Sequence, residues 1–197
     1  MTRQGLIQAV VVGCALVGGA APGARADGWV TIIGTTPAAV CEAAAAEAKR
    51  SEVGTRSELE ACDRVVDAWP SPRLETAVAY VNRSVIHFVR GETAAAIADT
   101  SAAIRLDDGL GEAFLDRGIA LAAQHRPGEA IRDFVRAVSL RLGKPALAYF
   151  DLALAREDTG DLVGAYKDFR HAAEADPAWD APRAELARFK VVQAPSS

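Results

Sequence analysis

The three histidines are the side chains most able to act as general bases or metal ligands, yet their positions favour neither role. His87, His125 and His171 lie 38 and 46 residues apart, without the close spacing that is typical of zinc ligands. The sequence also lacks a His-Glu-x-x-His motif, a phosphate-binding Gly-rich loop, a dinucleotide-binding fingerprint and a Gly-x-Ser-x-Gly elbow. We therefore expect no enzyme activity, no metal and no cofactor. The enzymatic alternative is a hydrolase in which a pocket gathers His87 and a carboxylate at hydrogen-bond distance.

The N-terminal residues predict the compartment of the protein, and the compartment determines whether its cysteines are oxidised. Residues 1–26 combine Arg3, an apolar run and the small-x-small site Ala24-Arg25-Ala26, which indicates a secretory signal peptide cut after Ala26. Export to a bacterial periplasm fits this short signal best. The alternative is lipoprotein processing at Cys14. The apolar run falls short of the ~20 strongly apolar residues of a membrane-spanning helix, and no later stretch reaches that length, so we expect no membrane insertion after cleavage.

Cleavage would leave two cysteines, Cys41 and Cys62, in an oxidising compartment. A disulfide between them is the first hypothesis. It would close a loop of about 20 residues and stabilise the fold by on the order of 3 kcal/mol. Two free buried thiols and a zinc site are the alternatives, and a zinc site would need two further ligands.

Composition predicts a helical protein without affinity for polyanions. Of the 197 residues, 50% are hydrophobic, 24% are charged and only 6% are aromatic, and alanine recurs in runs such as residues 43–46 and 94–96. This balance favours close-packed helices over a β-sandwich. The net charge is -4, and signal cleavage would remove two more positive charges. Nucleic-acid binding and capture by an anionic membrane are therefore not expected.

The most specific pattern is an internal repeat of about 34 residues. Each copy shows helical apolar spacing interrupted once by turn residues, at 90–92, 125–128 and 158–161, so we expect two helices of about 12 to 14 residues per copy. One pair cannot bury its apolar face alone, so the copies must stack. The small residues that return in steps of 34 and then 35 are Ser84, Gly118 and Ala153; Ala96, Ala130 and Ala165; and Ala103, Ala137 and Ala172.

The pattern resembles the tetratricopeptide repeat family. The matching residues are Tyr80-x-x-Arg83-Ser84, Phe114-x-x-Arg117-Gly118, Tyr149-x-x-Leu152-Ala153, Ala130-x-x-x-Phe134, Ala165-x-x-x-Phe169 and Asp176-Pro177. Ser84 replaces the usual glycine and Thr100 the usual aromatic residue. The resemblance implies an all-α, right-handed superhelix with copy 1 at residues 77–110, copy 2 at 111–144 and copy 3 at 145–178. We also expect an exported bacterial member of the family.

The flanking segments complete this architecture. Residues 37–72 are interpreted as a degenerate helix pair tied by the disulfide. In this pair Cys41 lies near the start of the first helix and Cys62 near the end of its antiparallel partner, so the two cysteines face each other. Residues 27–36 are expected to form an extended tail. An amphipathic segment at 179–192 should cap the stack, and residues 193–197 should form a disordered tail.

The resemblance also implies where a partner would bind. Stacked first helices line a concave groove that holds peptides or helices of partner proteins in this family. The chaperone-binding members hold a carboxylate there with Lys, Asn and Arg, whereas Asn82 is the only match in this sequence. We therefore expect an adaptor or scaffold whose partner carries apolar anchors and some Lys or Arg. The groove positions are Val78, Val81, Asn82, Val85, Val89, Glu112, Leu115, Asp116, Ile119, Ala122, Leu147, Phe150, Asp151, Leu154 and Asp158.

Two readings compete with this hypothesis. The protein could be a self-associating structural spacer, or its groove could be filled by the chain itself. Burial of Val81, Leu115, Ile119 and Phe150 together would show that no apolar groove exists.

Overall fold

The computed structural model describes residues 36–68, 72–140 and 142–189, which contain nine α-helices and no strand. The predicted all-α fold class is therefore confirmed. The predicted signal peptide, residues 27–35 of the predicted tail, residues 69–71, residue 141 and residues 190–197 lie outside the described residues. No described helix combines the length and apolar character needed to cross a membrane. The helices are α1 (Pro37–Ser51), α2 (Arg56–Val66), α3 (Arg73–Val89), α4 (Thr93–Leu106), α5 (Gly111–Ala123), α6 (Pro127–Ser139), α7 (Ala146–Asp158), α8 (Leu162–Ala175) and α9 (Ala181–Leu186).

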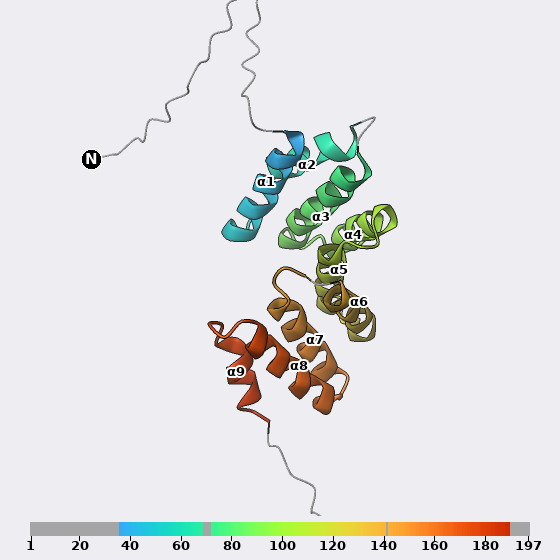
Figure 1. Cartoon of the computed structure of the whole chain (residues 1–197). Coiled ribbons are helices and arrows are strands. Elements are labelled where there is room, and N and C mark those ends of the chain that lie inside the picture. Colours follow the sequence, from blue (N-terminus) through green and yellow to red (C-terminus); the bar gives the residue numbers. More distant parts are fainter. Residues whose placement is uncertain (1–35, 69–71, 141, 190–197) are drawn as a thin grey trace, which may run out of the picture. The chain divides into compact units, whose positions relative to one another are not determined.

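These helices form antiparallel pairs that stack in chain order within residues 34–197 (Figure 1). Helix α1 packs on α2, α3 on α4, α5 on α6 and α7 on α8, and the first helices α1, α3, α5 and α7 also contact one another in sequence. Helix α3 begins four residues before the predicted start of copy 1, because Pro72 lies just outside its first turn. Helices α5 and α6 lie within residues 111–144, and α7 and α8 lie within residues 145–178.

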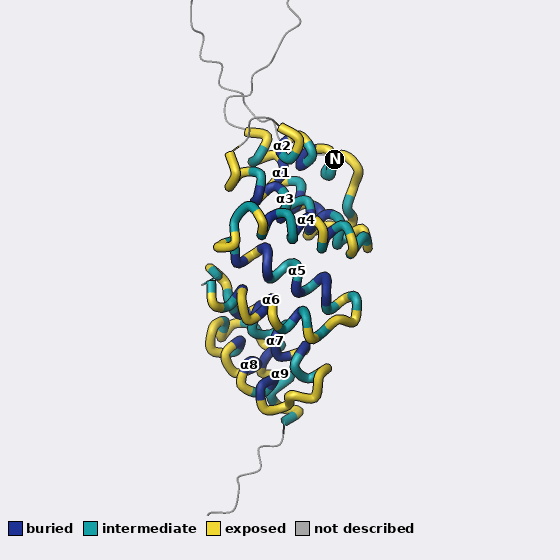
Figure 2. Tube along the Cα trace, turned by 90° about the vertical axis from the view of Figure 1, so that its right-hand side faces the viewer, coloured by how far each residue is buried: buried dark blue, intermediate teal, exposed yellow. Residues whose placement is uncertain are grey.

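Small residues let the two helices of a copy approach closely. A Cβ atom on Gly118 would lie 2.5 Å from Cε1 of Phe134, so only glycine fits beneath this buried ring. Copy 1 has Ser84 and Thr100 at the equivalent positions, and both are buried. The two departures from the repeat pattern therefore compensate each other, because the larger first-helix residue occurs opposite the smaller second-helix residue. Figure 2 shows such buried stretches alternating with exposed ones along the helices.

The turns inside the copies share one backbone conformation. Gly91, His125 and Gly160 follow the same period and have φ values of 76°, 58° and 82°. In each turn the next residue donates its backbone N–H to a carbonyl five residues earlier, with distances of 2.8 to 3.0 Å. This is a Schellman cap, which needs a left-handed residue and favours glycine. His125 occupies the position without that freedom.

Arginine–aspartate pairs join the two helices of copies 1 and 2. Nε and Nη2 of Arg83 donate to both carboxylate oxygens of Asp99 at 2.8 Å. Arg117 binds Asp133 in the same way at 2.7 and 2.9 Å. Both aspartates are buried. Each arginine therefore neutralises a carboxylate that has little contact with water.

The same arginines also connect successive pairs. Nη1 of Arg83 donates to Asp63 of α2 at 2.7 Å, and Nη1 of Arg117 contacts the Ser101 hydroxyl of α4 at 3.3 Å. Each guanidinium therefore holds its own second helix and the preceding one. The N-terminal helix pair is joined to copy 1 in the same way that copy 1 is joined to copy 2.

Both ends of the stack are closed by their own contacts. The structure joins Cys41 and Cys62 in a disulfide with a Cα–Cα distance of 4.5 Å, inside an apolar cluster. At the other end, Leu186 and Phe189 pack against Phe169. Helix α9 has only six residues, and residues 190–192 of the predicted capping segment lie outside the described residues.

Candidate functional site

One stripe along each first helix is left open by the stacking. At 100° per residue, Val78, Asn82, Val85 and Val89 lie within about 60° of one another around α3. The equivalent residues of α5 and α7 repeat this arrangement. We call these twelve positions the inner stripe: Val78, Asn82, Val85, Val89, Glu112, Asp116, Ile119, Ala123, Leu147, Asp151, Leu154 and Asp158. All of them are exposed or half-buried.

Four of the predicted groove residues lie outside this stripe. Around its helix axis, each of Val81, Leu115 and Phe150 lies about 60° from the first stripe residue of the same helix. Ala122 lies about 80° from the first stripe residue of α5, in the same direction. Val81 is only 7% exposed and packs with Ala103 and Ala113, so its placement in the groove is wrong. Leu115 and Ala122 are half-buried against the core between α5, α6 and α7.

Phe150 belongs to the C-terminal aromatic cluster. Its ring lies 5.4 Å from the Phe169 ring and 4.8 Å from the Trp179 ring. Residues after α8 therefore cover part of the third copy. Leu115, Ile119 and Phe150 nevertheless remain half-buried, so the condition that would have excluded a groove is not met.

The inner stripe contains an apolar pocket of about 220 Å³ with a carboxylate in its lining. Val85 and Phe88 come from α3, Ile119 and Asp116 from α5, and Leu147 from α7. Val89 of α3, Lys49 of α1 and the buried positions Ser84 and Ala96 complete the lining. Lys49 and Phe88 were not among the residues predicted from the sequence. Phe88 adjoins the predicted Val89, but Lys49 required knowledge of how α1 lies against the stack.

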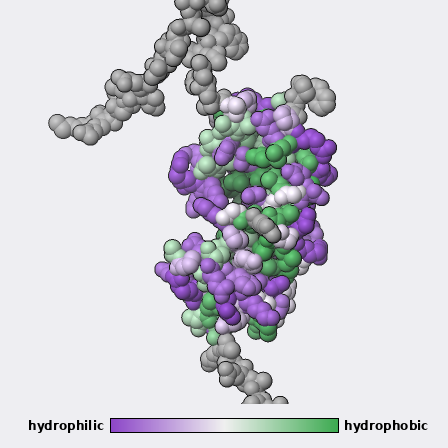
Figure 3. Space-filling view, in the orientation of Figure 1, coloured by the Kyte–Doolittle hydropathy of each residue, from purple (hydrophilic) through white to green (hydrophobic). Residues whose placement is uncertain are grey.

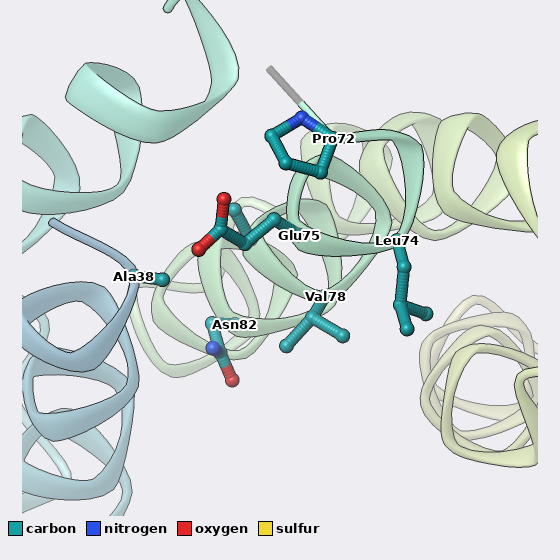
Figure 4. A pocket seen from close by; sticks show the side chains of 7 residues that line it. Ala38, Pro72, Leu74, Glu75, Val78 and Asn82 are labelled. Atoms are coloured by element: carbon teal, nitrogen blue, oxygen red, sulfur yellow. The ribbon is translucent and has the colours of Figure 1, made fainter. Parts of the chain in front are cut away.

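A second pocket of about 480 Å³ lies near the start of α3. Figure 4 shows Glu75, Val78 and Asn82 on α3 and Ala38 on α1 around this space. Leu74 also lines it and is among the exposed large apolar residues. These first-turn residues were missed because the predicted copy began at residue 77. Figure 3 shows apolar surface in the middle of the helical unit, bordered by hydrophilic surface.

Two carboxylates occupy equivalent inner positions in copies 2 and 3. Loss of solvation raises the pKa of Asp116 to about 7, with Glu112 adding to the rise and Lys49 opposing it. Loss of solvation alone raises the pKa of Asp151 to about 6. Within the described part of the chain, neither side chain has a hydrogen bond or an ion pair within 4 Å. Copy 1 has the uncharged Asn82 at this position.

His87 meets only part of the condition set for a hydrolase. Its Nδ1 lies 2.6 Å from Glu92 Oε2, and its Nε2 lies 3.7 Å from Asp99 Oδ2. However, Asp99 is already held by Arg83, and the Ser84 hydroxyl donates to a backbone oxygen of its own helix at 2.7 Å. His87 lines neither of these two pockets. His87 therefore lies in the contact between α3 and the first half of α4, beside side chains that already have partners.

Comparison with known proteins agrees with this architecture. A thermophilic TPR protein of Thermus thermophilus matches with a TM-score of 0.64 at 20% identity, over 78% of this chain and 80% of that one. The fold is that of tetratricopeptide repeats. A MamA structure matches this repeat fold with a TM-score of 0.57 at 22% identity, over 72% of this chain and 80% of that one.

Two further relatives bear on the repeats. The first TPR of Spaghetti (RPAP3) bound to the HSP90 peptide SRMEEVD matches with a TM-score of 0.56 at 22% identity, over 58% of this chain and 90% of that one. Tetratricopeptide repeat protein 36 of Homo sapiens is 40% identical over 75 residues. That alignment covers 36% of this chain and 39% of the length of the human protein. No protein-family model matches the chain.

Proposed function

We propose that this chain is a non-catalytic adaptor that holds a peptide or helix of a partner protein on its inner stripe. The observation that carries the proposal is the contrast in burial within each first helix. Residues beside the stripe pack into the core, whereas Val78, Leu147 and Leu154 stay 37 to 38% exposed. Exposed apolar side chains gathered on one face are typical of a protein-binding surface.

The charge of the stripe defines the partner's chemistry. A TPR neighbour binds the acidic HSP90 peptide SRMEEVD, but here Asp116 and Asp151 would repel such a peptide. A segment with apolar anchors and Lys or Arg would satisfy both the apolar surface and the carboxylates. The proposed partner is therefore an apolar and basic peptide or helix.

Selection from a random peptide library displayed on phage tests this function on the purified protein. We expect enriched peptides whose affinity falls at least about tenfold on Leu154→Asp, since the new charge lies in an apolar contact. Val163→Asp on α8 is the matched control, because Val163 is also an exposed apolar residue, at 69%, and should leave affinity unchanged. Failure to enrich peptides, or equal losses in both variants, would contradict the proposal.

We also propose export, with cleavage after Ala26 and function in a bacterial periplasm. The support is the charge and apolar pattern of residues 1–26. N-terminal sequencing after expression in a bacterial host should find Asp27 as the first residue in the periplasmic fraction. A cytoplasmic product that begins at residue 1 or 2 would contradict export, and a lipid-modified Cys14 would support the alternative processing.

A further inference from the structure

We propose that the pocket at Asp116 binds a lysine or arginine side chain of the partner, with the aliphatic stem between α3, α5 and α7 and the cationic head at the carboxylate. This inference rests on the proposed function, because it names the side chain that anchors the partner on the inner stripe.

The pocket walls suit the stem of a long side chain. Val85, Phe88, Ile119 and Leu147 come from three different helices, so the space exists only in the assembled stack. Its volume of about 220 Å³ is several times the roughly 30 Å³ that one water molecule occupies in the liquid. Methylene groups that enter this space would exclude water from apolar surface, as the stems of Lys and Arg do elsewhere.

The charge of the lining selects the head group. Asp116 is the acidic residue in this lining and Lys49 is the basic one, but the two do not form an ion pair within 4 Å. The other charge that acts on Asp116 comes from Glu112 on its own helix, and it is also negative. A neutral or anionic ligand would leave the Asp116 carboxylate without compensation, whereas an ammonium or guanidinium group would pair with it.

The pocket beside Arg117 does not offer this chemistry. It is lined by Arg117, Arg126 and Arg132 together with Asp133 and Glu129. Arg117 already binds Asp133, and Arg126 and Arg132 contact Glu129. These charges satisfy one another, so the pocket has no uncompensated group that would select a ligand. The Asp116 pocket therefore differs in holding an unpaired carboxylate.

Two short peptides that differ in one side chain provide the test. The probes are acetyl-Ala-Leu-Lys-Leu-Ala-amide and its norleucine analogue, which has a stem of similar length without the charge. Each is titrated into the isotopically labelled protein, and binding is followed by backbone amide shifts in α3, α5 and α7. We expect the lysine peptide to bind about tenfold more tightly, as a charge-assisted hydrogen bond predicts.

Three variants separate this role from general effects of charge. Asp116→Asn should remove the preference for lysine, whereas Asp108→Asn, which makes the same charge change in the loop after α4, should keep it. Lys49→Gln should strengthen binding of the lysine peptide, because it removes the competing cation. The lysine preference of the unaltered protein should also weaken as pH falls from about 8 to about 5, where Asp116 takes up a proton.

The outcomes distinguish this inference from the proposed function. Equal binding of both peptides, with no effect of Asp116→Asn, would overturn the basic anchor while peptide binding on the stripe stands. Absence of shifts from either peptide at millimolar concentration would also overturn the basic anchor. The proposed function would then be judged separately by the library selection and the Leu154→Asp variant.

Discussion

The second helices and the inner faces of the first helices follow the same repeat but use it differently. On α4, α6 and α8 the same residue types return: Ala96, Ala130 and Ala165 are buried, and Asp99, Asp133 and Asp168 each bind an arginine. On the inner stripe most residue types change from copy to copy, although Asp116 and Asp151 share one position. The alanines and aspartates that repeat on the second helices hold the two helices of a copy together, whereas the open positions vary more.

Copy 3 shows which part of the packing pattern is fixed. Leu152 occupies the position of Arg83 and Arg117, and it is buried in the core. Nη1 of Arg156, four residues later, binds Asp168 at 2.6 Å instead. Because residues four apart share a helix face, the cation can move by one turn while the aspartate stays in place. Burial still raises the pKa of Asp168 more than Arg156 lowers it.

The largest expected loss of stability comes from removing an arginine–aspartate pair between the two helices of a copy. Arg117→Met would leave Asp133 buried without its partner, so we expect a loss of about 3 kcal/mol in the free energy of unfolding. Leu154→Asp on the inner stripe should cost less than about 1 kcal/mol. Urea unfolding followed by circular dichroism measures both. Equal losses would show that the two surfaces do not differ in this way.

Gly118→Ala tests the close approach of the helices. The added methyl group would overlap the Phe134 ring, so the variant should lose about 1 to 2 kcal/mol despite the better helix propensity of alanine. Gly128→Ala on α6 is the matched control, because a Cβ atom there meets nothing within 4 Å. It should be neutral or stabilising in the same unfolding experiment. A neutral Gly118→Ala would contradict tight packing at this contact.

The Asp116 carboxylate on the inner stripe should make the free energy of unfolding depend on pH. Folding raises the pKa of Asp116 from an ordinary 3.8 to about 7, so the folded state binds more protons than the unfolded state between these values. The contribution of Asp116 to the free energy of unfolding should therefore fall as pH rises through this window. Urea midpoints measured from about pH 5 to about pH 8 should show a smaller decline in Asp116→Asn than in the unaltered protein. The same pH dependence in both proteins would show that folding does not raise the pKa of Asp116.

The smallest effect concerns the turn of copy 2. His125→Gly should raise the free energy of unfolding by about 0.5 to 1 kcal/mol, because glycine adopts a left-handed backbone without the steric cost that a Cβ atom carries. Gly160→Ala, at the equivalent turn of copy 3, should have the opposite sign. Thermal unfolding of the two variants under identical conditions measures the difference. Destabilisation by His125→Gly would show that the imidazole itself is needed there.

The sequence predicted what depends on local periodicity. The repeat and its helix pairs follow from apolar spacing and turn residues, and the Cys41–Cys62 pairing follows from the antiparallel register of α1 and α2. The placement of Val81 in the groove was wrong because the family resemblance does not specify the angle around α3, which directs this side chain into the core. Asp99 and Asp133 were missed, although both lie 16 residues after an arginine of the repeat.

Other parts of the site depend on the stack and not on the period. Lys49 belongs to the pocket because α1 lies against α3, and no repeat relates it to Asp116. The pairing of Arg156 with Asp168 replaces the regular pattern after Leu152 takes the usual arginine position. These contacts require the relative placement of helices, which a one-dimensional pattern does not specify.

The most direct test of the binding surface is hydrogen–deuterium exchange of the protein with and without a library-selected peptide. The inner stripe predicts slower exchange in α3, α5 and α7, with α4, α6 and α8 unchanged. Slower exchange confined to α4, α6 and α8 would contradict the assignment of the inner stripe as the partner-binding surface.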